Sequence, residues 1–355
     1  MAIHLKALVI TMNKLSKYEL FFLSAINTCA VFPGIYTSMS INKANTMTIF
    51  GVLIGFILSI STIIIIYFLK KKYKEINIKN KSILIKLISI LIILVCISIY
   101  FINSWSIINF FISQLLTRNS YYVITIVFFF IVIYLANKDI VVIGRTSIIL
   151  MFISTIFSFI AILSLISKIN IYNFLPLFTT SKNNFLKVIL YSYTLSSAPL
   201  IPVLILNNYK DRSLKTILLG YLIGTVLIIT YLFFILAVYG VDLASLAYYP
   251  GYFLLKNIKI FNFIERVENI LIAIYINNAF INFATISHYY KSTFNKKIFI
   301  GLSLLIPIIS IYCFKNYDIR FIYNYIPYLL GLLIIIIIVL SILSIIKKTI
   351  RKKTL

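Results

Sequence analysis

Acidic residues, histidine and cysteine are all scarce in this chain. Its 355 residues include 8 Asp and Glu, 2 His and 3 Cys, against 33 Lys and Arg. The cysteines, Cys29, Cys96 and Cys313, are odd in number and far apart, so they give neither a disulfide framework nor a zinc-ligand spacing. His4 and His288 lie near opposite ends, and no phosphate-binding glycine loop accompanies them. The sequence therefore predicts a protein that is not an enzyme and that holds no metal or cofactor.

Charge of either sign is also low for a chain of this length. Charged residues make up 12% of the sequence, whereas about 25% is typical of a soluble domain. Hydrophobic residues make up 62%, and the mean hydropathy is +1.05. The apolar residues gather in stretches of about 17 residues or more, the length a helix needs to cross a membrane. The predicted crossings are 20–41, 47–69, 83–112, 120–136, 146–167, 184–206, 216–239, 263–288, 298–314 and 326–346.

The apolar stretches lack the alternation of a membrane barrel, as the run Ile63–Leu69 illustrates, so they predict helices. We expect an all-α integral membrane protein with about ten transmembrane helices in one domain, residues 19–346. Residues 1–18 are expected to form an N-terminal tail with no removable signal peptide. Residues 347–355 are expected to form a basic C-terminal tail.

The Lys and Arg residues fall mostly in alternate gaps between the apolar stretches. Counted from the first residue, the odd-numbered gaps hold 23 of the 33 and the even-numbered gaps hold ten. Because short basic loops stay in the cytoplasm, both termini are expected to be cytoplasmic. The basic clusters, Lys70–Lys74 and Lys347–Lys353, suit anionic lipid headgroups. The cations are scattered over short loops, so nucleic acid is not an expected partner.

The first predicted crossing has small and polar residues beside a Pro-Gly pair near its middle. The run Asn27–Phe32 is followed by Pro33 and Gly34. Proline lacks a backbone donor and glycine tolerates most conformations, so the helix is expected to kink or unwind there. The sixth crossing repeats the arrangement, with Ser196, Ser197 and Ala198 before Pro199.

Interruptions in the first and sixth of ten helices indicate two inverted five-helix repeats with a binding site between them at mid-membrane. Backbone N–H groups freed at such a break carry partial positive charge and suit a carboxylate. The alternative is that these residues only bend the helices. Trp105 in the third crossing is interpreted as an anchor at the membrane interface, and Asn278 in the eighth as a residue that hydrogen-bonds between helices.

The chain resembles the B subunit of spore germinant receptors, which belongs to the amino acid, polyamine and organocation transporter superfamily. The resemblance rests on the order and spacing of short marks over nearly the whole chain. They are Gly144-Arg145, Asn173-Phe174-Leu175-Pro176, Gly240, Tyr249-Pro250 and Phe263-Ile264-Glu265-Arg266.

The resemblance implies a membrane-embedded receptor subunit of the spore inner membrane that recognises a nutrient germinant, often an amino acid. It also implies A and C receptor subunits as partners. A secondary amino acid transporter on the same scaffold is the alternative, and a structural membrane protein with a degenerate site is a third.

The site hypothesis assigns separate roles to residues of the two interrupted helices. Backbone amides near Thr28 and Ser197 would hold a carboxylate, asparagine or serine side chains would take an ammonium group, and Phe32 would shape the side-chain compartment. The candidate binding residues are Asn27, Thr28, Cys29, Ala30, Phe32, Gly34, Asn109, Ser196, Ser197, Ala198 and Asn278.

Overall fold

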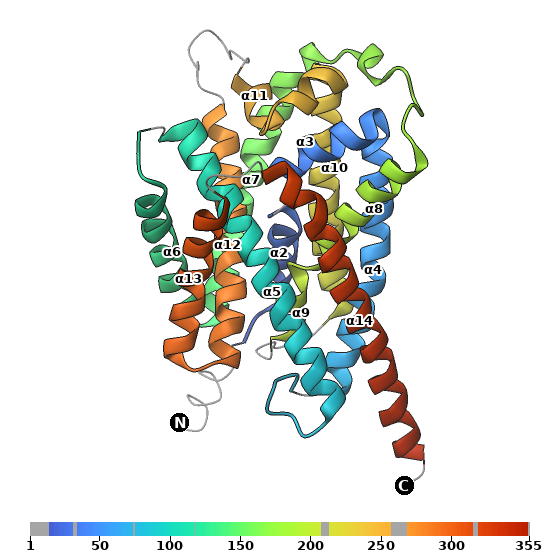
Figure 1. Ribbon diagram of the computed structural model, residues 1–355, viewed down its shortest axis with the longest axis vertical. Helices are drawn as coiled ribbons and strands as arrows, with labels where there is room; N and C mark the ends of the chain where they lie inside the picture. The colour runs from blue at the N-terminus through green and yellow to red at the C-terminus, as the bar shows by residue number, and fades with distance from the viewer. Residues whose placement is uncertain are drawn as a thin grey trace.

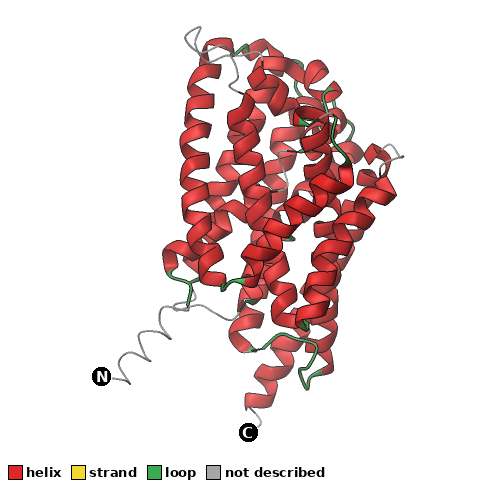
Figure 2. Cartoon of the chain, turned by 90° about the vertical axis from the view of Figure 1, so that its left-hand side faces the viewer, coloured by secondary structure: helices red, strands yellow, loops and turns green. Residues whose placement is uncertain are grey.

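The computed structural model describes a bundle of helices, and its described residues contain no strand (Figures 1 and 2). The structure describes residues 14–30, 34–73, 75–116, 118–206, 213–256, 268–314 and 319–353. Seven of the described helical stretches are long and apolar enough to cross a membrane, and Tyr121–Asn137 is a shorter apolar helix. The prediction of an all-α membrane protein is confirmed.

The described helices follow the ten predicted crossings in order. The first is divided into α2 (Lys17–Cys29) and α3 (Ile35–Ala44), and the sixth into α8 (Lys182–Ser197) and α9 (Leu200–Ile205). The other eight are α4 (Thr48–Lys72), α5 (Ile83–Phe110) with the π-helical turn η2 (Phe111–Leu115), α6 (Tyr121–Asn137), α7 (Ile140–Leu165), α10 (Leu214–Leu246), α12 (Glu268–Thr293), α13 (Lys296–Phe314) and α14 (Ile319–Lys353).

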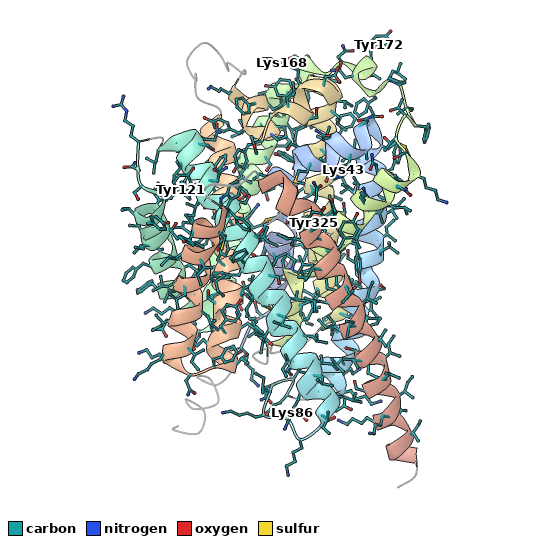
Figure 3. The ribbon with its side chains drawn as sticks, viewed as in Figure 1. Lys43, Lys86, Tyr121, Lys168, Tyr172 and Tyr325 are labelled. Carbon is teal, nitrogen blue, oxygen red and sulfur yellow. The ribbon has the colours of Figure 1, made fainter. Side chains whose placement is uncertain are left out.

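Short helices connect the crossings at the upper end of the bundle in Figure 1. They are η1 (Asn45–Met47), η3 (Ile166–Lys168), η4 (Ile171–Phe174) and α11 (Pro250–Lys256). Lys43 and Lys168 lie at this upper end, and Lys86 lies at the lower end (Figure 3). The lower end also carries the last turn of α4 and the long C-terminal extension of α14, which continues helically to Lys353. Among the described residues, the basic segments at the end of α4, at Lys86 and at the end of α14 therefore share one end of the bundle.

Two pairs of glycines, one on α10 and one on α4, bring helices into close contact. On α10, a Cβ atom at Gly220 would lie 2.3 Å from the Phe21 carbonyl oxygen of α2, and Gly224 meets the same helix one turn later. On α4, a Cβ atom at Gly55 would lie 2.6 Å from the Ile189 carbonyl oxygen of α8, with Gly51 one turn earlier. Only glycine permits such close backbone approach, the basis of Gly-x-x-x-Gly helix pairing in membranes.

These two contacts are related by the five-helix repeat. The second crossing packs on the sixth and the seventh packs on the first, so a shift of five crossings converts one contact into the other. The sequences at the contacts are nearly the same, Gly-Val-Leu-Ile-Gly at 51–55 and Gly-Tyr-Leu-Ile-Gly at 220–224. The repeated sequence and the repeated contact agree with two inverted halves.

The interruptions of the first and sixth crossings differ in kind. The first separates α2 from α3 by residues 30–34, of which Val31, Phe32 and Pro33 lie outside the described residues. The sixth spans only Ala198 and Pro199, and both residues keep right-handed helical dihedral angles. The Ala198 N–H still donates to the Thr194 carbonyl at 3.0 Å. The sixth helix is therefore only locally disturbed, and its backbone frees no amide at Ala198.

Trp105 lies in the core and is not an interfacial anchor. Its exposed fraction is 6%, and its ring makes an edge contact with Phe314 of α13 at a centroid distance of 6.3 Å. The third helix is packed between other helices at this point. The interpretation from sequence was wrong because hydropathy alone does not reveal which face of a long helix is covered.

Candidate functional site

Polar side chains at the end of α2 are committed to bonds within the bundle. Asn27 Nδ2 donates to the Leu23 carbonyl at 2.8 Å, and its Oδ1 accepts from Asn282 Nδ2 of α12 at 2.9 Å. Thr28 Oγ1 donates to the Ser24 carbonyl at 2.9 Å. Asn27, Thr28 and Asn282 are all buried. The bond between the two asparagines holds the end of α2 against α12, and the bonds to the Leu23 and Ser24 carbonyls lie within the last turns of α2.

The start of α3 meets a cluster of hydroxyl groups from α5 and α12. A Cβ atom at Gly34 would lie 2.8 Å from both Ser106 Oγ and Tyr275 Oη, which are themselves 3.0 Å apart. Nearby, Tyr249 Oη donates to the Ser106 carbonyl at 3.1 Å and accepts from Asn109 Nδ2 at 3.0 Å. Gly34 is therefore required by space, because any side chain would displace this hydrogen-bonded cluster.

Of the candidate residues of the sixth helix, Ser196 contacts α4. Ser196 Oγ is hydrogen-bonded to Ser59 Oγ of α4, and Ser197 Oγ donates to the Tyr193 carbonyl of its own helix at 2.7 Å. Ala198 is fully buried at the end of α8. Ser196 therefore stabilises the α4–α8 contact, as serines between membrane helices commonly do, whereas the Ser197 hydroxyl bonds within α8.

A cavity of about 100 Å³ lies beside the interruption of the first helix. Its inner wall includes Cys29 at the end of α2, and α7, α10, α11 and α12 provide the remaining walls. Gly251 and Leu254 of α11 close one end. Most of its lining is apolar, including Met151, Ile162, Leu165, Leu227, Ile228, Phe234 and Ile274.

Two polar groups that line this cavity have no hydrogen-bond partner among the described residues. They are Ser154 Oγ of α7 and Asn278 Oδ1 of α12, and the two residues are 4% and 3% exposed. A buried polar atom without a partner costs free energy, so such atoms mark places where water or a ligand binds. The described residues that line the cavity include no lysine, arginine, aspartate, glutamate or histidine.

The structure brings only part of the predicted set together. Cys29 and Asn278 line one cavity, and Gly34 lies beside Tyr275, which also lines it. Asn27, Thr28 and Ala30 are buried next to it within α2 or at its end, whereas Asn109 binds Tyr249. Ser196 lies at the α4–α8 contact, and none of Ser196, Ser197 and Ala198 lines this cavity. Phe32 lies outside the described residues.

Sequence reasoning missed Ser154 and Tyr275, which are as close to the cavity as any predicted residue. Ser154 has no distinguishing neighbours in the sequence, because serines and threonines recur throughout the fifth crossing. A signal for Tyr275 exists in its position one turn before Asn278 on the same helix. The repeated Gly-x-Leu-Ile-Gly pattern was also overlooked, although it marks the helix contacts directly.

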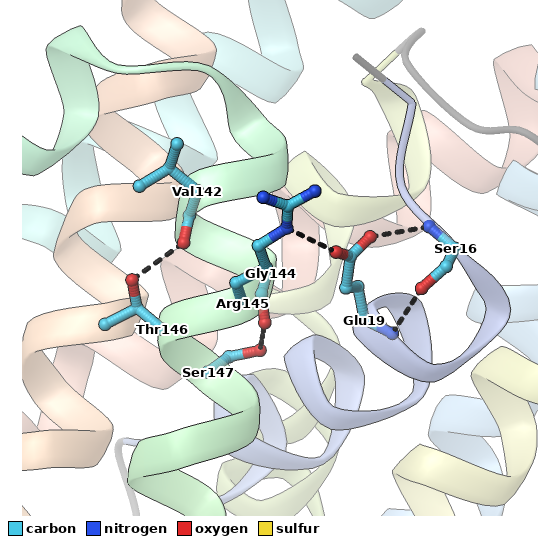
Figure 4. Close-up of polar contacts among 7 residues, drawn as sticks. All are labelled: Ser16, Glu19, Val142, Gly144, Arg145, Thr146 and Ser147. Carbon is cyan, nitrogen blue, oxygen red and sulfur yellow. Dashed lines mark hydrogen bonds and ion pairs between the residues drawn. The ribbon is translucent and has the colours of Figure 1, made fainter. Parts of the chain in front are cut away.

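The resemblance marks occupy defined positions in the fold. Asn173 Nδ2 of η4 donates to the Ala237 carbonyl at 2.9 Å, immediately before the kink at Gly240. Arg145 pairs with Glu19 of α2, and Gly144 makes room for that helix (Figure 4). The Phe263–Arg266 mark lies outside the described residues.

Comparison with known proteins places these features in a family. A sequence model described as spore germination protein matches residues 14–322. The chain is also 25% identical over 272 residues to "Putative spore germination protein YfkT" of Bacillus subtilis (strain 168). That alignment covers 75% of each chain.

Proposed function

The chain belongs to the spore germination protein family of membrane proteins, and on that premise we propose that it is a nutrient-sensing subunit of a germination receptor. The ligand would be a small molecule such as an amino acid, the class that the resemblance implies. The observation that carries the proposal is the cavity beside the interrupted first helix, which is lined by both Cys29 and Asn278. A ligand bound there would contact α2, α7, α10 and α12 together and could bias their arrangement.

The test is the nutrient dose dependence of germination in spores whose response depends on this chain. Asn278→Leu removes the amide at nearly constant volume, and it should raise the half-maximal nutrient concentration about tenfold, the effect of one lost buried hydrogen bond. Asn277→Leu is the matched control, because Asn277 is adjacent on α12 and does not line the cavity. An unchanged dose dependence with normal amounts of the Asn278→Leu protein in the membrane would contradict the proposal.

Ser197→Leu is a poorer test of the same idea. Ser197 is 1% exposed, and its hydroxyl is bonded within α8. A leucine at this buried position would overpack the bundle at a cost of about 1–3 kcal/mol, so a lost response would not distinguish binding from folding.

Secondary transport is the alternative function, and two buried ionisable residues favour it. Glu19 and His288 are 6% and 8% exposed, near the start of α2 and near the end of α12. Ionisable groups buried within a helical bundle commonly serve proton-coupled transport. Uptake of labelled amino acids into reconstituted vesicles under a proton gradient would support transport, whereas binding without uptake supports a receptor.

The proposed setting is the inner membrane of the spore, with both termini in the cytoplasm and with A and C receptor subunits as partners. Support for the orientation comes from the basic segments that share the lower face of the bundle. There, Lys72 Nζ donates to the Ile345 carbonyl and Lys348 Nζ donates to the Lys72 carbonyl, so these two bonds join the end of α4 to α14. Anionic lipids are the proposed counter-charge for the basic residues around this contact. Labelling of terminal cysteines in spheroplasts, and copurification with the neighbouring receptor subunits, would test this setting.

A further inference from the structure

We propose that the cavity beside α2 binds a small uncharged molecule with a short aliphatic body and one group that both donates and accepts a hydrogen bond, such as a primary amide or an alcohol. This inference rests on the proposed nutrient-sensing role for its biological meaning, but it replaces the zwitterionic amino acid with an uncharged ligand. The binding itself can be measured on the purified protein.

The polar groups of the cavity define one end of this ligand. Asn278 Oδ1 can only accept a hydrogen bond, so the ligand must bring an N–H or O–H donor. The Ser154 hydroxyl can donate to a ligand oxygen. Both atoms are buried and lack a partner among the described residues, so a ligand that satisfies both removes two desolvation penalties at once. An amide or hydroxyl group provides both functions within one small group.

The remaining lining requires the rest of the ligand to be apolar and uncharged. The walls are mostly aliphatic and aromatic side chains, and no described lining residue carries a charge. A carboxylate or ammonium group would lose its hydration there without gaining a counter-charge, which costs far more than one hydrogen bond returns. The chemistry of the cavity therefore disfavours a zwitterion.

Size limits the ligand to very few atoms. The cavity measures about 100 Å³. An apolar cavity of about 150 Å³ holds a benzene molecule, so roughly four or five non-hydrogen atoms suit the present one. Propionamide has this size and the required polar group. Propionate and alanine have similar dimensions but carry charge, so they serve as matched comparisons.

The cavity has an incompletely buried margin on α7 and α10. Its margin there is formed by partly buried residues, among them Ser158 of α7 and Thr230 of α10. The neighbouring Phe159 and Val226 are 61% and 60% exposed on the apolar outer surface. An uncharged molecule that dissolves in the bilayer can approach by this side, whereas an ion cannot.

Cys29 provides a direct reporter of occupancy. It lines the cavity, whereas Cys96 is buried elsewhere in α5 and Cys313 is exposed on α13. Iodoacetamide is small and uncharged, so in protein held in lipid nanodiscs it should alkylate Cys313 quickly, Cys29 more slowly and Cys96 least. Mass spectrometry of the three cysteine peptides gives each rate. Propionamide should protect Cys29 saturably, whereas propionate and alanine at equal concentration should not.

Variants identify the polar contacts. Ser154→Ala and Asn278→Leu should each raise the half-protecting propionamide concentration about tenfold, as expected for one lost hydrogen bond. Ser164→Ala is the matched control on α7, because the Ser164 hydroxyl donates to the Ala161 carbonyl and does not line the cavity. It should leave the protection unchanged.

Three outcomes would overturn the inference. They are a Cys29 rate equal to that of Cys96, equal protection by propionate, and protection that is insensitive to both variants. Protection by alanine and not by propionamide would reject the uncharged class and leave the nutrient-sensing proposal intact. Protection by propionamide together with an unchanged spore response of Asn278→Leu would reject the nutrient-sensing proposal and leave the ligand class intact.

Discussion

Glu19 and Arg145 join the lower ends of α2 and α7 (Figure 4). Arg145 Nε lies 3.3 Å from Glu19 Oε1, and the other carboxylate oxygen accepts the Ser16 N–H at 2.6 Å. Ser16 Oγ in turn accepts the Glu19 N–H at 3.2 Å, which completes a capping box at the start of α2. One carboxylate thus begins the first helix and fixes it to the fifth.

These two roles of Glu19 can be separated by substitution. Glu19→Gln keeps the capping box and removes the ion pair, and it should cost at most about 1 kcal/mol, because the Arg145 side chain is 61% exposed and screened by solvent. Glu19→Ala also removes the acceptor of the Ser16 N–H, although the Ser16 hydroxyl still accepts the backbone N–H of residue 19, and it should cost about 0.5–1.5 kcal/mol more, the range for one hydrogen bond. Thermal unfolding in detergent measures both, with Arg145→Gln as the third variant. Equal losses for Glu19→Gln and Glu19→Ala would contradict the capping role.

The glycine contacts predict a contrast among Gly→Ala substitutions. Gly220→Ala places a methyl group against the Phe21 carbonyl, and Gly55→Ala places one against the Ile189 carbonyl, so each should cost about 1–3 kcal/mol. Gly301→Ala is the matched control, because a Cβ atom there has no neighbour within 4 Å. It should be neutral or stabilise α13 by up to about 1 kcal/mol. Similar stabilities for all three variants in denaturant titrations would refute the close helix contacts.

The crossings were predictable from the sequence because the membrane imposes one simple rule. Backbone groups in lipid must be satisfied within a helix, so each long apolar stretch becomes a helix with bounds close to the predicted ones. The interruption before Gly34 was predictable for a local reason, the loss of a backbone donor at Pro33. Hydropathy carries this information without any knowledge of the neighbouring helices.

The arrangement of the site was only partly predictable, because it depends on which helices meet. The backbone amides near Thr28 and Ser197 were expected to hold a carboxylate, but the sequence could not show where the hydroxyls of these residues go: both bind carbonyls four residues earlier in their own helices. Pro199 was expected to break the sixth helix, yet the backbone remains helical on both sides of it. The cavity that joins Cys29 to Asn278 also requires Ser154 of the fifth helix, and no local pattern relates these three positions.

Gly240 gives a prediction about the C-terminal part of α10. Its φ of 69° with ψ of −177° lies in a region that only glycine occupies readily. A Cβ atom would have its nearest neighbour in Asn173 at 3.6 Å, so the cost of Gly240→Ala should come from backbone strain alone, about 1–3 kcal/mol. Gly240→Asn should give no relief, since this ψ lies outside the left-handed helical region that asparagine tolerates. A stability close to that of the parent protein for either variant, measured by thermal unfolding, would argue against this kink.

The hydrogen bond between Asn27 and Asn282 gives the last prediction. Asn282→Leu leaves Asn27 Oδ1 buried without its donor and should cost about 0.6–1.7 kcal/mol, the range for hydrogen bonds between membrane helices. The double variant Asn27→Leu, Asn282→Leu should recover part of this loss, because it removes both polar groups together. Thr285→Val is the control on α12, since the Thr285 hydroxyl binds only the Ile281 carbonyl of its own helix. Unfolding by increasing SDS in mixed micelles provides the measurement. A double variant that loses as much stability as the two single variants added together would show that the asparagines contribute through separate contacts, and the bond between them would then add no coupling energy between α2 and α12.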